Sequence, residues 1–180
     1  MNKLLKKILI SIVTLMSIFS CSKIEPKIYQ QNSLKFDIRN FFKGDLQAYG
    51  ILQDRSGKVI KTFTVKMHGS WKENEGILKE DFIFSDQKTD HREWKISIID
   101  DHNFTAQAHD VVGHAKGQQY GNAVRMQYVL TIPIDQKKYN FKIDDWMYLV
   151  DQDSLINTST IKKFGFKMAS LTIAFKKIGL

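Results

Sequence analysis

The chain has 180 residues, 43% of them hydrophobic, a formal net charge of +8 and a single cysteine. This length fits one domain. The lysines are dispersed and no basic helix or aromatic-interleaved RNA motif is present, which argues against a nucleic-acid partner. One cysteine excludes an internal disulfide and a zinc site built from several thiolates.

Residues 1–20 have the pattern of a bacterial lipoprotein signal peptide. Three lysines precede an apolar run, Ile8–Phe19, which at 12 residues is too short to span a membrane as a helix. Cys21 follows Ile18-Phe19-Ser20, so we expect cleavage before Cys21 and attachment of acyl chains, palmitate among them, to the new terminus. The alternative is a plain secretory signal with an incidental cysteine. An aspartate directly after Cys21 would resemble an inner-membrane retention signal, but this position is Ser22. We therefore expect an outer-membrane protein that faces the periplasm and contacts the membrane through its acyl anchor.

The exported part divides into a tether and one domain. Residues 21–43 are expected to form the lipidated tether and an N-terminal segment, with a short helix near 36–42 that plugs or flanks one end of the domain. Residues 44–180 are expected to form the domain itself. At this size it can bury a core without disulfides or metal.

The domain is predicted to be all-β. Residues 59–71 alternate between apolar and polar side chains, and the same period of two recurs at 78–84, 92–98, 104–110 and 124–132. Further strands are expected at 46–52, 139–150, 155–163 and 167–178, whereas 111–121 is expected to be a glycine-rich loop. About nine strands predict a single antiparallel β-barrel or strongly curled sheet, lipocalin- or calycin-like in architecture. Lys66, His68, Lys95 and Arg125 in mid-strand argue against a membrane-spanning barrel.

Four polar residues, Glu80, Arg92, Asp110 and Asn122, share the apolar phase of their strands. Pairing Ile98 with Phe104 places Arg92 opposite Asp110, which predicts an internal ion pair near one mouth of the barrel. Similar counting places Asn122 opposite Asp110 and Phe84 opposite Arg92. One interpretation is an ion pair that fixes strand register. The other is a head-group site in which Arg92 binds a carboxylate or phosphate, with Trp94 and Tyr128 as further ligand-binding candidates.

Other patterns indicate structure more than chemistry. Asp144 and Asp145 are neighbours on a strand and therefore point to opposite faces; a bulge is expected where the apolar phase changes between Ile143 and Trp146. Asp54, Arg55 and Gly57 lie in a turn. No pair of histidines has the spacing of a metal site, so we expect no metal and no cofactor, and the pattern identifies no catalytic residue.

Several short motifs together resemble the lipoprotein family named domain of unknown function 3833. They include Gln53 to Val59, Gly69-Ser70-Trp71, Arg92-x-Trp94, Asp110 to Gly113, Gly121-Asn122-Ala123 and Asp144 to Tyr148. The resemblance covers nearly the whole exported chain and implies an exported Gram-negative lipoprotein, but it supplies no activity. Genes of this family are often neighbours of lipid-modifying enzymes, and the resemblance therefore favours a fatty-acyl ligand.

Three functions fit these observations. The first is a lipid-anchored periplasmic barrel that binds or carries an apolar, acyl ligand, with Arg92, Asp110 and Asn122 as head-group contacts. The second is a lipid-modifying enzyme that uses Asp110 or Glu80 as acid or base beside Arg92. The third is an envelope scaffold whose barrel is filled by its own side chains.

Overall fold

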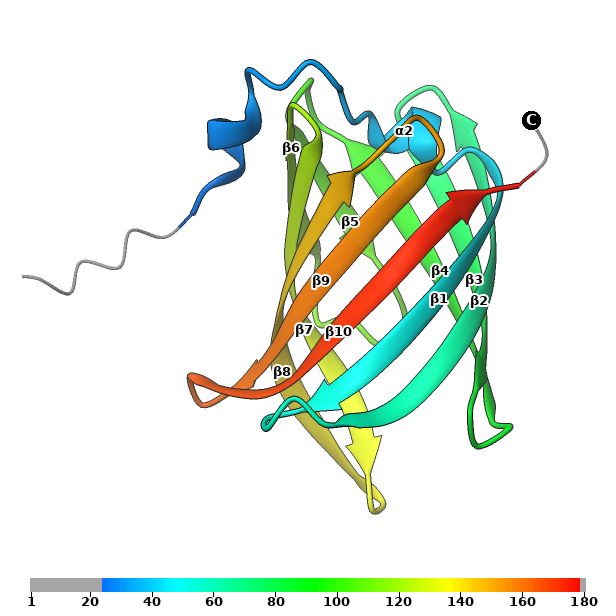
Figure 1. Cartoon of the computed structure of the whole chain (residues 1–180), viewed down its shortest axis with the longest axis vertical. Coiled ribbons are helices and arrows are strands. Elements are labelled where there is room, and N and C mark those ends of the chain that lie inside the picture. The colour runs from blue at the N-terminus through cyan, green and yellow to red at the C-terminus, as the bar shows by residue number, and fades with distance from the viewer. Residues whose placement is uncertain (1–23, 179–180) are drawn as a thin grey trace, which may run out of the picture.

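The computed structural model describes residues 24–178, and ten antiparallel strands in it close into one barrel (Figure 1). Their order around the barrel is β1-β10-β9-β8-β7-β6-β5-β4-β3-β2, so each strand pairs with its sequence neighbours and β1 with β10 closes the ring. The strands are β1 (Gly44–Asp54), β2 (Val59–Lys72), β3 (Glu75–Phe84), β4 (Thr89–Ile98), β5 (Asn103–Gln107), β6 (Ala115–Tyr120), β7 (Ala123–Ile134), β8 (Lys137–Leu149), β9 (Ser154–Lys163) and β10 (Phe166–Lys177).

The all-β prediction is confirmed, and one strand was missed. Residues 115–120, expected in a loop, form β6 and pair with both β5 and β7. Gly117 hid this strand, because a glycine in an otherwise polar stretch is typical of a loop. Here it accommodates a neighbour: a Cβ at Gly117 would lie 2.0 Å from the ring of Phe104.

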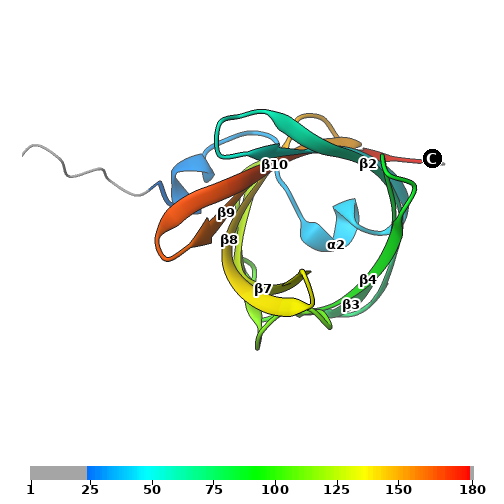
Figure 2. The same cartoon turned by 90° about the horizontal axis from the view of Figure 1, so that it is seen from below.

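A short helix, α2 (Ile38–Phe41), lies across one end of the barrel, as expected of a plug (Figures 1 and 2). Asp37 caps it by accepting hydrogen bonds from the backbone N–H groups of Arg39 and Asn40. The aromatic side chains that the helix region brings into the barrel are buried and pack against one another: Phe36, Phe41 and Phe42. This end of the barrel is therefore closed by apolar packing.

Gly69 allows the plug to pass close to β2. A Cβ at Gly69 would lie 1.6 Å from the carbonyl oxygen of Phe42, and this oxygen also accepts a hydrogen bond of 3.1 Å from Trp71 Nε1. We expect Gly69→Ala to lower the free energy of unfolding by about 1–3 kcal/mol, since overpacking forces the backbone apart. Urea unfolding measures this loss. A Trp71→Phe variant, which loses only the hydrogen bond, should cost less, and an equal or larger cost in Trp71→Phe would contradict the steric explanation.

The N-terminal segment runs along the outside of the barrel. It contains a 3-10 helix, η2 (Pro26–Tyr29), which contacts β6 and β7. The predicted signal peptide and the acylated Cys21 lie outside the described residues. Within residues 24–178 no helix combines the length and the apolar character needed to cross a membrane.

Candidate functional site

A cavity of about 130 Å³ lies inside the barrel below α2. Most of its wall is apolar, because the inward phase of the strands carries aromatic and aliphatic side chains; Phe63, Trp94 and Phe104 are examples. Part of the wall is polar and comes from Glu80, Arg92, Tyr128, Asp145, Asn157 and Ser159. A purely structural core would have little need for these groups, because burying a charge is costly without partners.

The predicted ion pair is confirmed. Arg92 Nη2 lies 2.6 Å from Asp110 Oδ2, and Arg92 Nε donates to the same oxygen at 3.1 Å. The register of β4 with β5 carries Asp110, just beyond the end of β5, to a position beside Arg92. The second carboxylate oxygen, Asp110 Oδ1, is buried and has no hydrogen-bond partner among the described residues.

Glu80 is the third member of this cluster. It lies directly opposite Arg92 in the pairing of β3 with β4, and its Oε2 is 3.9 Å from Arg92 Nη1. Burial raises the pKa of Glu80 to about 7, and the positive charge of Arg92 opposes this rise without cancelling it. The site therefore contains a carboxyl group that gains or loses a proton near neutral pH.

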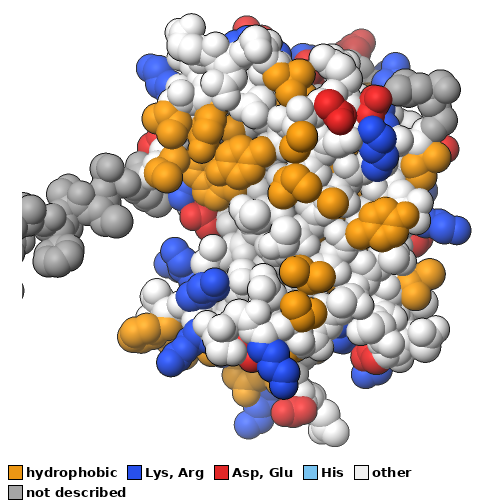
Figure 3. Space-filling view, in the orientation of Figure 1, with side chains coloured by type: hydrophobic (Ala, Val, Ile, Leu, Met, Phe, Trp, Pro, Cys, Tyr) orange, Lys and Arg blue, Asp and Glu red, His pale blue; other side chains and the backbone are white. Residues whose placement is uncertain are grey.

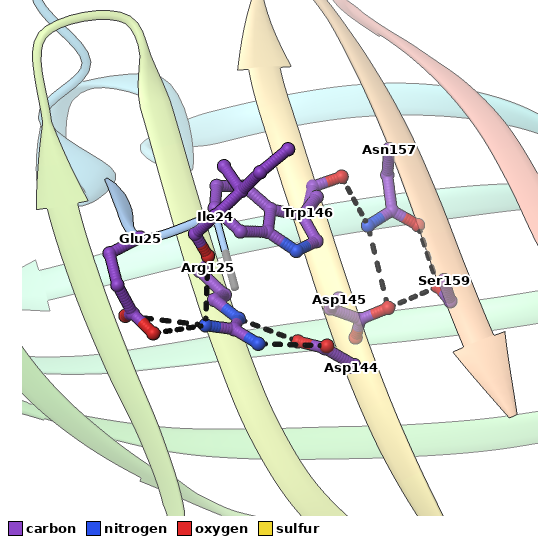
Figure 4. A network of polar contacts seen from close by, with 8 residues as sticks. All are labelled: Ile24, Glu25, Arg125, Asp144, Asp145, Trp146, Asn157 and Ser159. Carbon is purple, nitrogen blue, oxygen red and sulfur yellow. Dashed lines mark hydrogen bonds and ion pairs between the residues drawn. The ribbon is translucent and has the colours of Figure 1, made fainter. Parts of the chain in front are cut away.

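Asp145 forms a second buried group on β8 (Figure 4). It accepts hydrogen bonds from the hydroxyl groups of Tyr128, at 2.8 Å, and Ser159, and from Asn157 Nδ2 at 3.5 Å. Burial raises its pKa, while the hydrogen bonds from Ser159, Tyr128 and Asn157 oppose the rise. The ring of Tyr128 packs edge-on against Trp94 with centroids 5.4 Å apart, so the Asp145 group and the Arg92 cluster face the same cavity.

This arrangement suits a neutral polar group better than an anion. Two Arg92 nitrogens already bind Asp110, and a ligand carboxylate would meet Glu80 and Asp145 as well as the guanidinium. Carboxyl groups with a raised pKa can instead donate a hydrogen bond when protonated. A hydroxyl, an ester or an undissociated carboxylic acid on an apolar molecule would find both donors and acceptors here.

Asp144, the neighbour of Asp145, points to the outside of the barrel. There it accepts two hydrogen bonds from Arg125, at 2.7 and 2.9 Å, while Arg125 Nη1 donates to the carbonyl oxygen of Ile24 and to the carboxylate of Glu25 (Figure 4). Arg125 also lies over the ring of Trp146. This outer cluster fixes the N-terminal segment to β7 and β8.

The expected bulge in β8 is wrong. Pairing is continuous through residues 142–148 with β7 and through residues 142–149 with β9, and the inward phase runs through Ile143, Asp145 and Met147. Trp146 is apolar yet outward-facing because the N-terminal segment covers it, with Tyr29 packed edge-on at 6.2 Å. An apolar residue on the outward phase looked like a bulge in the sequence, but it reflects the N-terminal segment that covers Trp146 from outside the barrel.

Two positions in the predicted cluster are also wrong. Asn122 lies in the tight turn between β6 and β7 at the other end of the barrel from Asp110, where its side chain donates to the carbonyl of Leu149. Its predicted place depended on reading β6 as a loop. Phe84 closes its hairpin with Lys88, so Glu80 takes the place opposite Arg92.

The remaining motif residues lie in a turn. Asp54 Oδ1 accepts hydrogen bonds from the N–H groups of Ser56 and Lys58, and Gly57 has φ of +92° between β1 and β2. Arg55 is exposed in the same turn. Asn157 and Ser159 were missed, although both share the apolar phase of β9 with Leu155 and Ile161.

Comparison with known proteins gives a family and a fold. The family described as "Protein of unknown function (DUF3833)" matches residues 15–177. A search of curated proteins finds no match. Among solved structures, an S-type phycobiliprotein lyase from Guillardia theta is similar, with a TM-score of 0.55 and 9% identity over 88% of this chain and 99% of that one. A DUF3598 protein of unknown function from Nostoc punctiforme has a TM-score of 0.56 and 10% identity over 81% of this chain and 50% of that one. At such identities the likeness shows the barrel fold alone.

Proposed function

This chain belongs to the DUF3833 family of proteins of unknown function, and from that premise we propose that it is a periplasmic binding barrel for a small apolar ligand that carries one neutral polar group. The observation that carries the proposal is the 130 Å³ cavity with apolar walls and a polar strip containing Glu80, Arg92 and Asp145. Apolar walls with a few convergent polar groups are typical of small-molecule sites.

The size of the cavity limits the ligand. Sites for drug-sized molecules measure about 300–1,000 Å³, and a cavity of about 150 Å³ binds benzene. A whole long acyl chain does not fit 130 Å³. We therefore propose a short acyl compound, or the end of a longer one, with its ester, hydroxyl or undissociated carboxylic acid beside Glu80 and Asp145.

The membrane attachment belongs to the same proposal. The signal-like residues 1–20 and Cys21 support export, acylation of Cys21 and retention at the periplasmic face of the outer membrane. An anchor of this kind would keep the barrel close to a source of acyl compounds.

The proposal is tested by quenching of Trp94, which lines the cavity. A Trp71→Phe/Trp146→Phe variant leaves Trp94 as the single emitter, and the probe is the methyl ester of propanoic acid brominated at its terminal carbon, which is short enough for the cavity. We expect saturable quenching. In the matched variant that retains only Trp146, on the outer face, the same ester should quench weakly and without saturation.

A second pair of variants locates the ligand. Ala106 is buried and lines the cavity, so Ala106→Leu fills part of the space and Ala106→Val fills less. Quenching of Trp94 should weaken in that order. Equal quenching in the two single-tryptophan proteins, or no quenching in either, would reject the binding function and favour a scaffold with a filled barrel.

A lipid-modifying enzyme is the second candidate, and one observation favours it. Glu80 has a pKa of about 7 beside Arg92, and such values are typical of general acids and bases. Glu80→Gln separates the two functions: it should leave binding of the ester intact in either case, whereas it should abolish any chemical change of bound ester that mass spectrometry detects after incubation.

A further inference from the structure

Three lysines form a row across the outside of the barrel. Lys162 on β9 is paired directly with Lys142 on β8 and with Lys167 on β10. All three are exposed, and none forms a salt bridge within residues 24–178. Like charges placed directly opposite on adjacent strands are destabilising, so this row lowers stability unless an anionic partner binds it.

A bulge in β10 completes the row. The pairing of β10 with β9 shifts between Lys167 and Ala169, leaving Met168 as the extra residue. Beyond the bulge Ser170 and Thr172 face outward and Leu171 inward, and the shift of one residue turns Lys167 to the outer face beside Lys162. Bulges commonly re-aim a side chain in this way.

The hairpin that joins β9 to β10 carries an unusual aromatic tip next to this row. Phe164 and Gly165 have φ of +52° and +84°, a conformation for which glycine, asparagine and aspartate are favoured. Phe164 nevertheless occupies it with 88% of its surface exposed, and Phe166 is 70% exposed. The ring of Phe164 contacts Lys163 Nζ, which lies 5.5 Å from the ring centroid. An exposed contact of this kind is weak, so a bulky ring in this strained position gains little from the fold itself.

The row lies on the face of the barrel from which the N-terminal segment departs. Ile24 is held through Arg125 to Asp144, and Asp144 is two residues from Lys142 on the same face of β8, a spacing of about 7 Å along the strand. Cys21 precedes Ile24 by three residues, a reach of about 10 Å. Figures 1 and 2 both show the β9–β10 hairpin and η2 on this side, and Figure 3 shows Lys and Arg side chains gathered over its lower part.

We infer that this corner, formed by the lysine row and the Phe164–Phe166 tip, docks onto a bilayer that contains anionic phospholipid. The lysines provide the charge complementarity, and the two phenylalanines enter the interface between head groups and acyl chains. The contact is non-covalent and orients the barrel relative to the membrane. It requires neither the cavity ligand nor acylation of Cys21.

The test uses the full chain and vesicles of phosphatidylcholine, with or without phosphatidylglycerol, whose acyl chains are brominated. Phe164→Trp reports on the tip, and Ile77→Trp, exposed on β3 diametrically opposite β8, is the matched control. Both variants share the same N-terminal segment, so its own effect on binding cancels. We expect stronger quenching at 164 than at 77, only with phosphatidylglycerol, and a loss of this difference at high salt.

Two lysine variants in the Phe164→Trp background complete the test. Near an anionic surface each lysine contributes roughly fivefold, so Lys142→Gln/Lys162→Gln/Lys167→Gln should shift the docking equilibrium about 100-fold towards the undocked state. Lys162→Glu should raise the thermal midpoint in solution and also remove the extra quenching. Three results would each overturn the proposal. The first is equal quenching at positions 164 and 77, and the second is quenching that is independent of phosphatidylglycerol. The third is protection of the tip from quenching that increases with protein concentration, which would show that a second copy of the chain covers it.

Discussion

Replacing Arg92 with methionine is expected to lower the free energy of unfolding by about 3–5 kcal/mol at neutral pH, because it leaves a buried carboxylate without its partner. That carboxylate is Asp110, whose Oδ2 loses both hydrogen bonds and whose Oδ1 has no partner in the part of the chain that the structure describes. Glu80 contributes less to the loss, because its pKa of about 7 lets it bind a proton instead. Urea unfolding followed by circular dichroism measures the change.

Matched variants separate the buried charge from the lost packing. Asp110→Leu should cost less than Arg92→Met, because Glu80 can ionise and pair with the guanidinium 3.9 Å away. The double variant Arg92→Met/Asp110→Leu should recover most of the stability, since replacing both partners with apolar groups is often close to neutral. A stability of Arg92→Met within 1 kcal/mol of the parent would show that Asp110 is hydrated in the folded protein.

The barrel and its ion pair could be predicted from sequence because both follow from period-two alternation. Alternation shows which residues of β4 and β5 face inward, and the short turn between these strands then allows only one pairing register. That register places Arg92 beside Asp110. The same reasoning failed for Phe84. The turn between β3 and β4 closes at Phe84 and Lys88 with Gln87 at φ of +64°, a tighter turn than the run of polar residues suggested.

The second half of the site was harder to predict because its residues look ordinary. Asn157 and Ser159 are small polar residues within an alternating strand, and only the closed barrel shows that they converge with Tyr128 on Asp145. Asp145 itself was obscured by its neighbours. Asp144 and Trp146 belong to a contact with the N-terminal segment about 120 residues earlier in the chain, and alternation within one strand carries no information about such an external partner.

Burial dominates the electrostatics of the cavity, and this gives the protein an unusual response to pH. Tyr128 and Asp145 share the direction of Glu80: desolvation raises the pKa of each. Arg92 is the positive group that opposes the shift in all three. The carboxyl groups that line the cavity therefore bind protons more tightly in the folded protein than in the unfolded chain. Protonated carboxyl groups are consistent with a neutral ligand.

The free energy of unfolding is therefore expected to fall as the pH rises from about 4.5 to about 7, by roughly 3 kcal/mol. Glu80 has an ordinary pKa of 4.5 in the unfolded chain and about 7 in the folded protein. Across this window the folded state keeps a proton that the unfolded state has released, and each further rise in pH favours unfolding. The raised pKa of Asp145 acts in the same direction. Urea unfolding at intervals across this window measures the slope.

Glu80→Gln is the control, because glutamine keeps the shape and removes the titration. Its stability should change much less across the same window and should exceed that of the parent above pH 7, where the parent must bury a charged Glu80. Arg92→Met should have the opposite effect and extend the fall in stability above pH 7, since the charge that opposes the pKa shift of Glu80 is lost. A slope that is unchanged in Glu80→Gln would place the titrating group elsewhere, with Asp145 as the next group to replace.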